Sequence, residues 1–236
     1  MLHLKWTAVL AVAVALVVVP AAKAALMLDL QNGSSIITDN GTGDSDPTIG
    51  RIINTSVVAG FGLTITVGQS NSPGTSTAGI LQIQTLAIQN LNPTSATLVV
   101  KLSDTGFTLP GSAGSIVRVD SSVGGTFTQA NVDDSVIFQS FADAANAQPA
   151  VAVPAPAMLF DKLNPSLFTE SFSGSNFVTF PRDAGPYSLS NEAIVTLSAG
   201  AQMNISGTTT ATLIPEPGVA TLILVAGAVI LHRRRI

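Results

Sequence analysis

The acidic side chains are the residues of this chain whose spacing suggests chemistry. Asp39, Asp44 and Asp46 stand together in a segment rich in Asn, Gly, Thr and Ser, which is typical of a loop. Oxygen-rich loops of this kind can bind calcium, but the residue spacing of an EF-hand loop and its distal glutamate are missing. We therefore expect a solvated turn here and keep calcium as the alternative.

Hydrolysis by a pair of carboxylates is the second chemistry to weigh. A glycosidase needs two carboxyl groups that face each other across a cleft, and residues 25–214 contain only two glutamates, Glu170 and Glu192. Asp133 and Asp134 are adjacent, so in a strand they would point to opposite faces. We expect a solvated acidic loop before a strand at this point, and we do not expect an enzyme.

Composition excludes several other functions. The chain has no cysteine, and its two histidines, His3 and His232, lie near the ends. Residues 25–214 therefore cannot form a Ser-His-Asp triad, a His-ligated zinc site or a disulfide framework. Residues 25–214 hold five basic and thirteen acidic residues, a net charge of −8. An acidic surface without a basic patch argues against nucleic acid as a partner.

A secreted carbohydrate-binding or hydrolytic protein is the main alternative to a structural role, because many carbohydrate-binding modules are β-sandwiches. Sugar-binding faces usually present exposed aromatic rings that carry a polar group. Residues 25–214 offer Tyr187 as the only tyrosine and no tryptophan, and the phenylalanines are expected in the core. The alternative stays open, with Asp134 as the residue to test.

The elements that would position these residues are β-strands. In residues 61–67 the alternation places Phe61, Leu63, Ile65 and Val67 on one face. Two short runs around Asn32-Gly33 predict a hairpin with a type I′ turn. Further strand patterns, separated by Gly, Pro, Asn and Ser clusters, occur at 80–89, 97–102, 115–121, 136–141, 192–197 and 203–213. This spacing predicts an all-β fold in which residues 25–214 form an antiparallel β-sandwich.

One Ala- and Pro-rich stretch, residues 148–156, interrupts the strand patterns and could divide two domains. The part that follows, residues 157–214, would be small for an independent domain without disulfides. We therefore expect one sandwich in which residues 148–156 form a long surface loop.

Residues 1–24 have the pattern of a secretory signal peptide. His3 and Lys5 give a positively charged start, and residues 8–19 form an apolar run. Ala22 and Ala24 supply the small residues that signal peptidase requires for cleavage after Ala24. The chain is therefore expected to be exported.

The last residues form a tail of three parts: Pro215-Glu216-Pro217, an apolar run at 218–231, and a basic end at 232–236 that contains Arg233, Arg234 and Arg235. The prolines should end the last strand. A helix over the apolar run would be roughly 21 Å long, short of the roughly 30 Å hydrocarbon core of a membrane. The arginines can lie at a headgroup layer on the cytoplasmic side. We therefore expect a helix of transmembrane type.

This order of parts resembles the PEP-CTERM sorting signal of bacteria. The resemblance implies recognition by an exosortase, which is a membrane protease, and cleavage at or near residues 215–217. It also implies a transient stay in the inner membrane, followed by a location at the cell surface or outside the cell. Proteins with such tails frequently accompany exopolysaccharide production, so a structural or adhesive role in the extracellular matrix is implied. A tail kept as a permanent membrane anchor is the further alternative.

Overall fold

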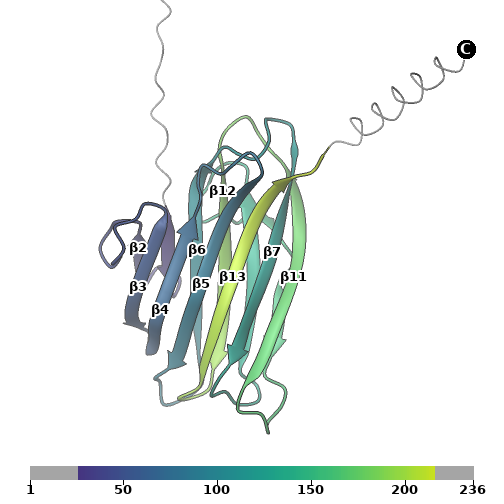
Figure 1. Ribbon diagram of the computed structural model, residues 1–236. Helices are drawn as coiled ribbons and strands as arrows, with labels where there is room; N and C mark the ends of the chain where they lie inside the picture. The colour runs from purple at the N-terminus through teal and green to yellow at the C-terminus, as the bar shows by residue number, and fades with distance from the viewer. Residues whose placement is uncertain (1–25, 216–236) are drawn as a thin grey trace, which may run out of the picture.

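The computed structural model describes residues 26–215, without the side chains of residues 64–66 and 85. In this part of the chain, thirteen strands form two antiparallel sheets that pack face to face (Figure 1). The predicted all-β sandwich is confirmed. Residues 26–215 include no helix long and apolar enough to cross a membrane. The predicted signal peptide and C-terminal helix lie outside the described residues.

Sheet A has seven strands, and their spatial order is β10 (Met158–Asp161), β8 (Ser135–Asp143), β12 (Tyr187–Leu197), β6 (Ala96–Phe107), β1 (Met27–Leu30) and β2 (Ser35–Thr38), with β9 (Val153–Pro154) beside β8. Sheet B has six strands, in the order β11 (Glu170–Pro181), β7 (Ile116–Phe127), β13 (Gln202–Leu213), β5 (Ala78–Asn90), β4 (Phe61–Ser70) and β3 (Arg51–Val58).

Consecutive strands cross repeatedly between the two sheets. From β5 to β8, and again from β11 to β13, each strand lies in the sheet opposite to that of its predecessor. Crossings of this kind are characteristic of jelly-roll sandwiches. Strands on both sides of residues 148–156 therefore belong to the same two sheets.

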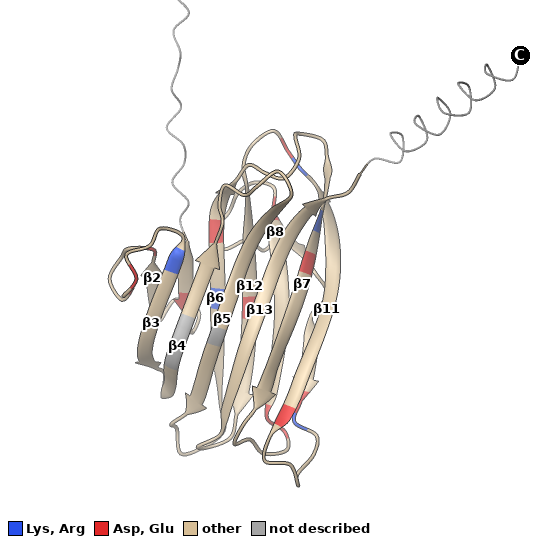
Figure 2. Cartoon of the chain, viewed as in Figure 1, with Lys and Arg blue, Asp and Glu red and all other residues tan. Residues whose placement is uncertain are grey.

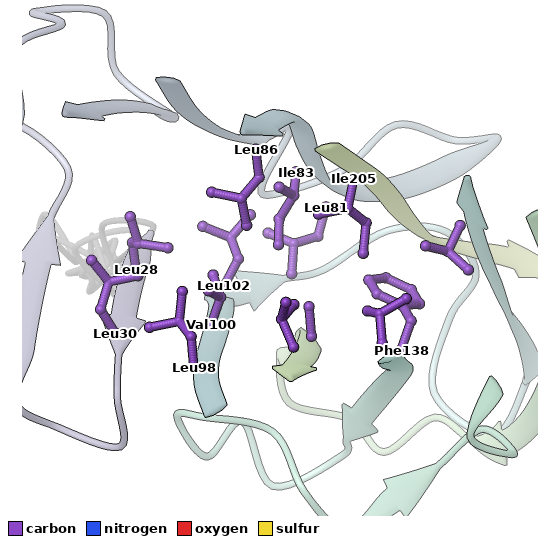
Figure 3. Close-up of a cluster of buried hydrophobic side chains, with 14 of the residues drawn as sticks. Leu28, Leu30, Leu81, Ile83, Leu86, Leu98, Val100, Leu102, Phe138 and Ile205 are labelled. Carbon is purple, nitrogen blue, oxygen red and sulfur yellow. The ribbon is translucent and has the colours of Figure 1, made fainter. Parts of the chain in front are cut away.

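The core lies between the sheets and is built by alternation along the strands. In β6, Leu98, Val100 and Leu102 are fully buried, and the residues between them are more exposed. Their side chains meet those of β1, β5, β8 and β13 (Figure 3). Burial of each such leucine contributes about 1.5–3 kcal/mol.

Strand β4 departs from the predicted alternation. Phe61 and Leu63 belong to the core, but a Cβ added at Gly68 would lie 2.5 Å from a methyl carbon of Leu102 in the opposite sheet. Val67 pairs with Gln84, whose side chain lies on the outer surface of the sheet. The register with β3 shifts at the same level. The prediction that Val67 shares a face with Leu63 is therefore wrong, because a β-bulge reverses the alternation between them.

The hairpin around Asn32-Gly33 is confirmed, since β1 pairs with β2 in antiparallel register. Its turn differs from the prediction. The last paired residues are Leu30 and Ser35, so the loop runs from Gln31 to Ser34 and is longer than a two-residue type I′ turn. Gln31, Asn32 and Gly33 all have positive φ angles.

The first part of residues 148–156 lies against the outer surface of sheet A, and Val153–Pro154 form β9 at its edge. The backbone amide of Ala150 donates to Ser190 Oγ at 2.8 Å, and Gln148 Nε2 donates to Ser103 O at 3.2 Å. The stretch consists largely of Ala, Val and Pro, and two of its alanines, Ala150 and Ala155, are buried. This loop is therefore a packed part of the sandwich.

Candidate functional site

The three aspartates proposed for calcium organise the loop between β2 and β3. Asp39 Oδ2 accepts a hydrogen bond from the amide of Gly50 at 2.8 Å. Asp44 Oδ1 accepts from the amides of Asp46 and Ile53, both at 2.9 Å. The first two carboxylates therefore bind backbone amides of the loop and, at Ile53, of the edge strand β3.

Asp46 is held in the same way. Its Oδ1 accepts from the amide of Thr48 at 2.9 Å, and its Oδ2 lies 3.0 Å from Arg51 Nε. The hydrogen bonds from Thr48 lower the pKa of Asp46. Within residues 26–215, no three His, Cys, Asp or Glu side chains gather as a set for a metal ion. Calcium binding stays a prediction from the sequence.

The expected solvated acidic loop at residues 133–134 is wrong for Asp134, which is 1% exposed. Its Oδ1 accepts from the amide and the hydroxyl of Ser198, at 2.6 and 2.5 Å, and its Oδ2 accepts from the amide of Asn131 at 2.7 Å. Both carboxylate oxygens are thus engaged in joining two loops. Asp133, by contrast, is exposed.

The two glutamates of the sandwich lie in different sheets. Glu170 begins β11 of sheet B and lies 3.2 Å from Lys162 Nζ. Glu192 lies on β12 of sheet A, 2.8 Å from Lys101 Nζ. Each carboxylate is paired with its own lysine.

Tyr187 does not offer a platform for a sugar ring, because it is fully buried. Its hydroxyl donates to Leu109 O at 2.7 Å, and its ring packs against Phe107 and Phe180 with centroid separations of 5.5 Å in both cases. Burial strongly raises the pKa of Tyr187.

Pro215 is the last residue that the structure describes. Strand β13 ends at Leu213, the amide of Ile214 donates to Ile116 O at 3.0 Å, and Pro215 is exposed. The proposed processing motif therefore begins directly after the last strand. The other predicted sorting residues lie outside the described residues: Ala22, Ala24, Glu216, Pro217, Arg233, Arg234 and Arg235.

The outer surface of sheet B has an unusual composition for a surface of this size. Three adjacent strands, β4, β5 and β13, contain no Asp, Glu, Lys, Arg or His. Charged residues of this sheet lie on β3, β7 and β11 (Figure 2). Soluble surfaces usually carry interspersed charges of both signs. The centre of sheet B therefore presents uncharged polar groups.

These polar groups are aligned across the sheet. Thr208 pairs directly with Ser122 of β7 and Gln82 of β5. The same row continues to Ser175 of β11 and Gln69 of β4. Directly paired residues project from the same side of a sheet, so five neighbouring strands contribute one hydroxyl or amide each. We define the polar face as this row with its outward neighbours: Gln69, Gln82, Gln84, Ser122, Ser175, Thr208, Thr210 and Thr212.

A shallow groove of about 290 Å³ runs along the β4–β5 side of the polar face and is lined by Gln69, Ser70, Asn71, Ile80, Gln82 and Gln84. Gln84 Nε2 donates to Gln69 Oε1 at 3.2 Å and to Gln82 Oε1 at 2.9 Å. These contacts align the three amides with one another. The groove can therefore present donors and acceptors to a ligand in a fixed arrangement.

The β11 side of the polar face carries an exposed aromatic ring. Phe177 is 52% exposed, and the guanidinium of Arg118 lies 4.0 Å from its ring centroid. Arg118 also lies 2.6 Å from Asp120 Oδ1, so the two charges largely neutralise each other. The phenylalanines were expected in the core, and this expectation is wrong for Phe177 and for Phe168, which is 70% exposed. The alternation that Phe177 shares with Ser171, Ser173 and Ser175 could have indicated its outward direction.

No protein-family model and no curated protein matches the chain. Among solved structures, a carbohydrate-binding module in complex with β-1,4-galactotriose is 8% identical, with a TM-score of 0.28; the match covers 67% of this chain and 90% of the module. A mannan-recognising carbohydrate-binding module is 13% identical, with a TM-score of 0.29 and coverage of 69% and 95%. An arabinose-bound α-L-arabinofuranosidase is 15% identical, with a TM-score of 0.28, and 24% of its length is matched.

The arrangement of the two sheets and the composition of the polar face show what class of protein this is. It is an antiparallel β-sandwich whose second sheet presents an extended, uncharged surface of hydroxyls and amides.

Proposed function

We propose that the protein binds a neutral polysaccharide through the polar face. This proposal rests on the row of polar side chains across sheet B, which consists of Ser175, Ser122, Thr208, Gln82 and Gln69. Hydroxyl and amide groups can both donate and accept hydrogen bonds, as sugar hydroxyls do. Covering them with an uncharged ligand costs far less desolvation than covering charged side chains.

The shape of the polar face favours an extended ligand. With neighbouring strands about 4.8 Å apart, a row across five strands is roughly 19 Å long. A surface of this length can contact several sugar units at once. Phe177 and Ile80, which are 52% and 36% exposed, add apolar surface for the carbon faces of sugar rings. The arrangement supports binding of a polymer and supplies no pair of facing carboxylates for its hydrolysis.

We also propose that the protein is exported, sorted by an exosortase and placed in an extracellular matrix. The tail that begins with Pro215-Glu216-Pro217 and carries three arginines near its end supports this second part. The exposed position of Pro215, directly after β13, is compatible with cleavage next to a folded sandwich. A polysaccharide-binding face would give such a protein its adhesive role.

Two substitutions test the polar face. Thr208→Val removes one hydroxyl from it, and Gln82→Leu removes one amide. Each should weaken binding to a soluble neutral polysaccharide about threefold to tenfold, because one neutral hydrogen bond contributes about 0.5–1.5 kcal/mol. Affinity electrophoresis of the full-length protein in gels containing mannan, galactan or hydroxyethyl cellulose would measure this change.

Thr196→Val is the matched control, since Thr196 projects from the outer surface of sheet A, where its hydroxyl contacts that of Thr97 at 2.9 Å. We expect this variant to bind as the unaltered protein does. The proposal fails if none of the three polymers retards the unaltered protein. It also fails if Thr196→Val weakens binding as much as Thr208→Val.

A further inference from the structure

A second, separate pocket lies at the end of the sandwich where β7 finishes and β11 begins (bottom of Figure 1). It has a volume of about 370 Å³ between the β7–β8 loop and the β10–β11 loop. We call it the loop pocket, and its lining residues are Gln129, Ala130, Asn131, Pro165, Ser166, Leu167 and Phe168.

Both walls of the loop pocket are anchored to the sandwich. Asp134 fixes the first wall, because its carboxylate accepts from the amide of Asn131 and from Ser198, and its carbonyl accepts from the amide of Lys162 at 2.8 Å. The hydrogen bond from the amide of Lys162 to the carbonyl of Asp134 joins the two walls directly. These hydrogen bonds therefore fix the two walls relative to each other.

The β10–β11 loop is also fixed from within. Glu170 accepts from the amides of Leu163 and Asn164, at 3.3 and 3.0 Å. The side chain of Lys162 is fully buried, and its Nζ donates to Asn164 O and lies 3.2 Å from Glu170. These contacts hold the loop so that Phe168 stays at its surface.

The lining of the pocket combines an aromatic ring with free amides. Phe168 is 70% exposed and Leu167 is 49% exposed, so this end of the sandwich presents an apolar surface to solvent. Among residues 26–215, the side-chain amides of Gln129 and Asn131 have no hydrogen-bond partner. None of the lining residues is charged. The pocket thus offers an apolar surface, several donors and acceptors, and no net charge.

We propose that the loop pocket binds one neutral hexose unit. A hexose ring presents carbon-bound hydrogens that pack on an aromatic ring and hydroxyls that bond amides. The volume lies at the small end of the range of ligand sites, about 300–1,000 Å³, which suits a single ring with a short extension. This site is distinct from the polar face and does not require that face to bind.

Small uncharged glycosides test the loop pocket, and variants of its lining residues separate binding there from any contact with the polar face. Saturation-transfer NMR of the full-length protein with millimolar methyl glucoside, methyl galactoside and methyl mannoside should show transfer to at least one of them. Phe168→Ala should weaken that binding about tenfold, through loss of apolar contact. Asn131→Ala should weaken it about threefold.

Leu163→Ala is the matched control, since Leu163 belongs to the same loop and is 73% exposed but does not line the pocket. Its affinity should equal that of the unaltered protein. Absence of transfer from all three glycosides overturns the proposal, as does equal weakening by Leu163→Ala and Phe168→Ala. Neither result bears on polymer binding by the polar face, which is measured separately with polysaccharide gels.

Discussion

Asp134 is the residue on which the geometry of one end of the sandwich depends. Replacement by alanine removes three hydrogen bonds and leaves the amides of Asn131 and Ser198 without their acceptor. Because an unpaired buried polar group costs about 1–3 kcal/mol, Asp134→Ala should lower the free energy of unfolding by about 2–4 kcal/mol. Urea denaturation followed by circular dichroism would measure this loss.

Asp133→Asn is the control for that experiment. Asp133 is exposed and has a φ of 80°, in a region that asparagine also tolerates. The change should leave the urea midpoint almost unaltered. Equal midpoints for Asp134→Ala and the unaltered protein would contradict the structural role of Asp134. Any loss of sugar binding in Asp134→Ala is expected to follow from this loss of structure.

Glu170 gives the protein a pH-dependent contribution to stability. The amide of Asn164 above all, with that of Leu163 and Nζ of Lys162, lowers the pKa of Glu170. A carboxyl group whose pKa is lower in the folded state stabilises fully at pH values above its unfolded pKa of about 4.3. That contribution disappears as the pH falls through the folded pKa.

Glu170→Gln should therefore reduce the change in urea midpoint between pH values above and below about 4.3. The measurement is a series of denaturation curves at several pH values for both proteins. An identical pH dependence in Glu170→Gln and the unaltered protein would show that this carboxylate makes no such contribution.

At the scale of the strands, close packing of the two sheets depends on small residues that face the core. A Cβ at Gly207 of β13 would lie 2.3 Å from a ring carbon of Phe138 in β8. Because overpacking of a core typically costs about 1–3 kcal/mol, Gly207→Ala should destabilise the protein by that amount. Thermal unfolding would show it as a lower midpoint.

Gly185→Ala is the matched control, because no atom lies within 4 Å of the Cβ it would add, and Gly185 has no positive φ. This variant should melt with the unaltered protein. If Gly207→Ala melts there as well, the contact between β13 and β8 is looser than the structure indicates.

The strands also show what a sequence pattern can and cannot predict. Alternation identified most strands because side chains of a half-buried strand change sides at every residue. It failed at Val67, since a bulge depends on the partner strand and leaves no local signal. It also did not reveal that Asp134 is buried, because its hydrogen-bond partner Ser198 is distant in the sequence.

The polar face could not be predicted from the sequence either, because it too depends on which strands are neighbours. Its central row joins residues as distant in sequence as Gln69 and Thr208, and only the order of strands in sheet B makes them neighbours. The absence of charge in residues 61–70, 78–90 and 202–213 was visible in the sequence. Its meaning follows only once these segments are known to be adjacent.

At the scale of the whole molecule, the proposed sorting step concerns the junction between the sandwich and its tail. The last backbone hydrogen bond of the sandwich in this region is from Ile214 to Ile116, and Pro215 is exposed beyond it. Pro215 is therefore accessible while β13 stays paired with β5 and β7, as the proposed cleavage requires. Sorting and folding should be separable.

Expression in two hosts that differ only in an exosortase would test this junction. With the protease, we expect a product whose mass lacks residues 1–24 and the tail beyond residues 215–217. Without it, the mass should include Arg233, Arg234 and Arg235, and the protein should stay in the membrane fraction.

Deletion of residues 215–236 should abolish membrane retention and leave the urea midpoint unchanged, since β13 remains complete. Identical masses in both hosts would contradict exosortase processing, and unchanged retention after the deletion would contradict a membrane role for the tail.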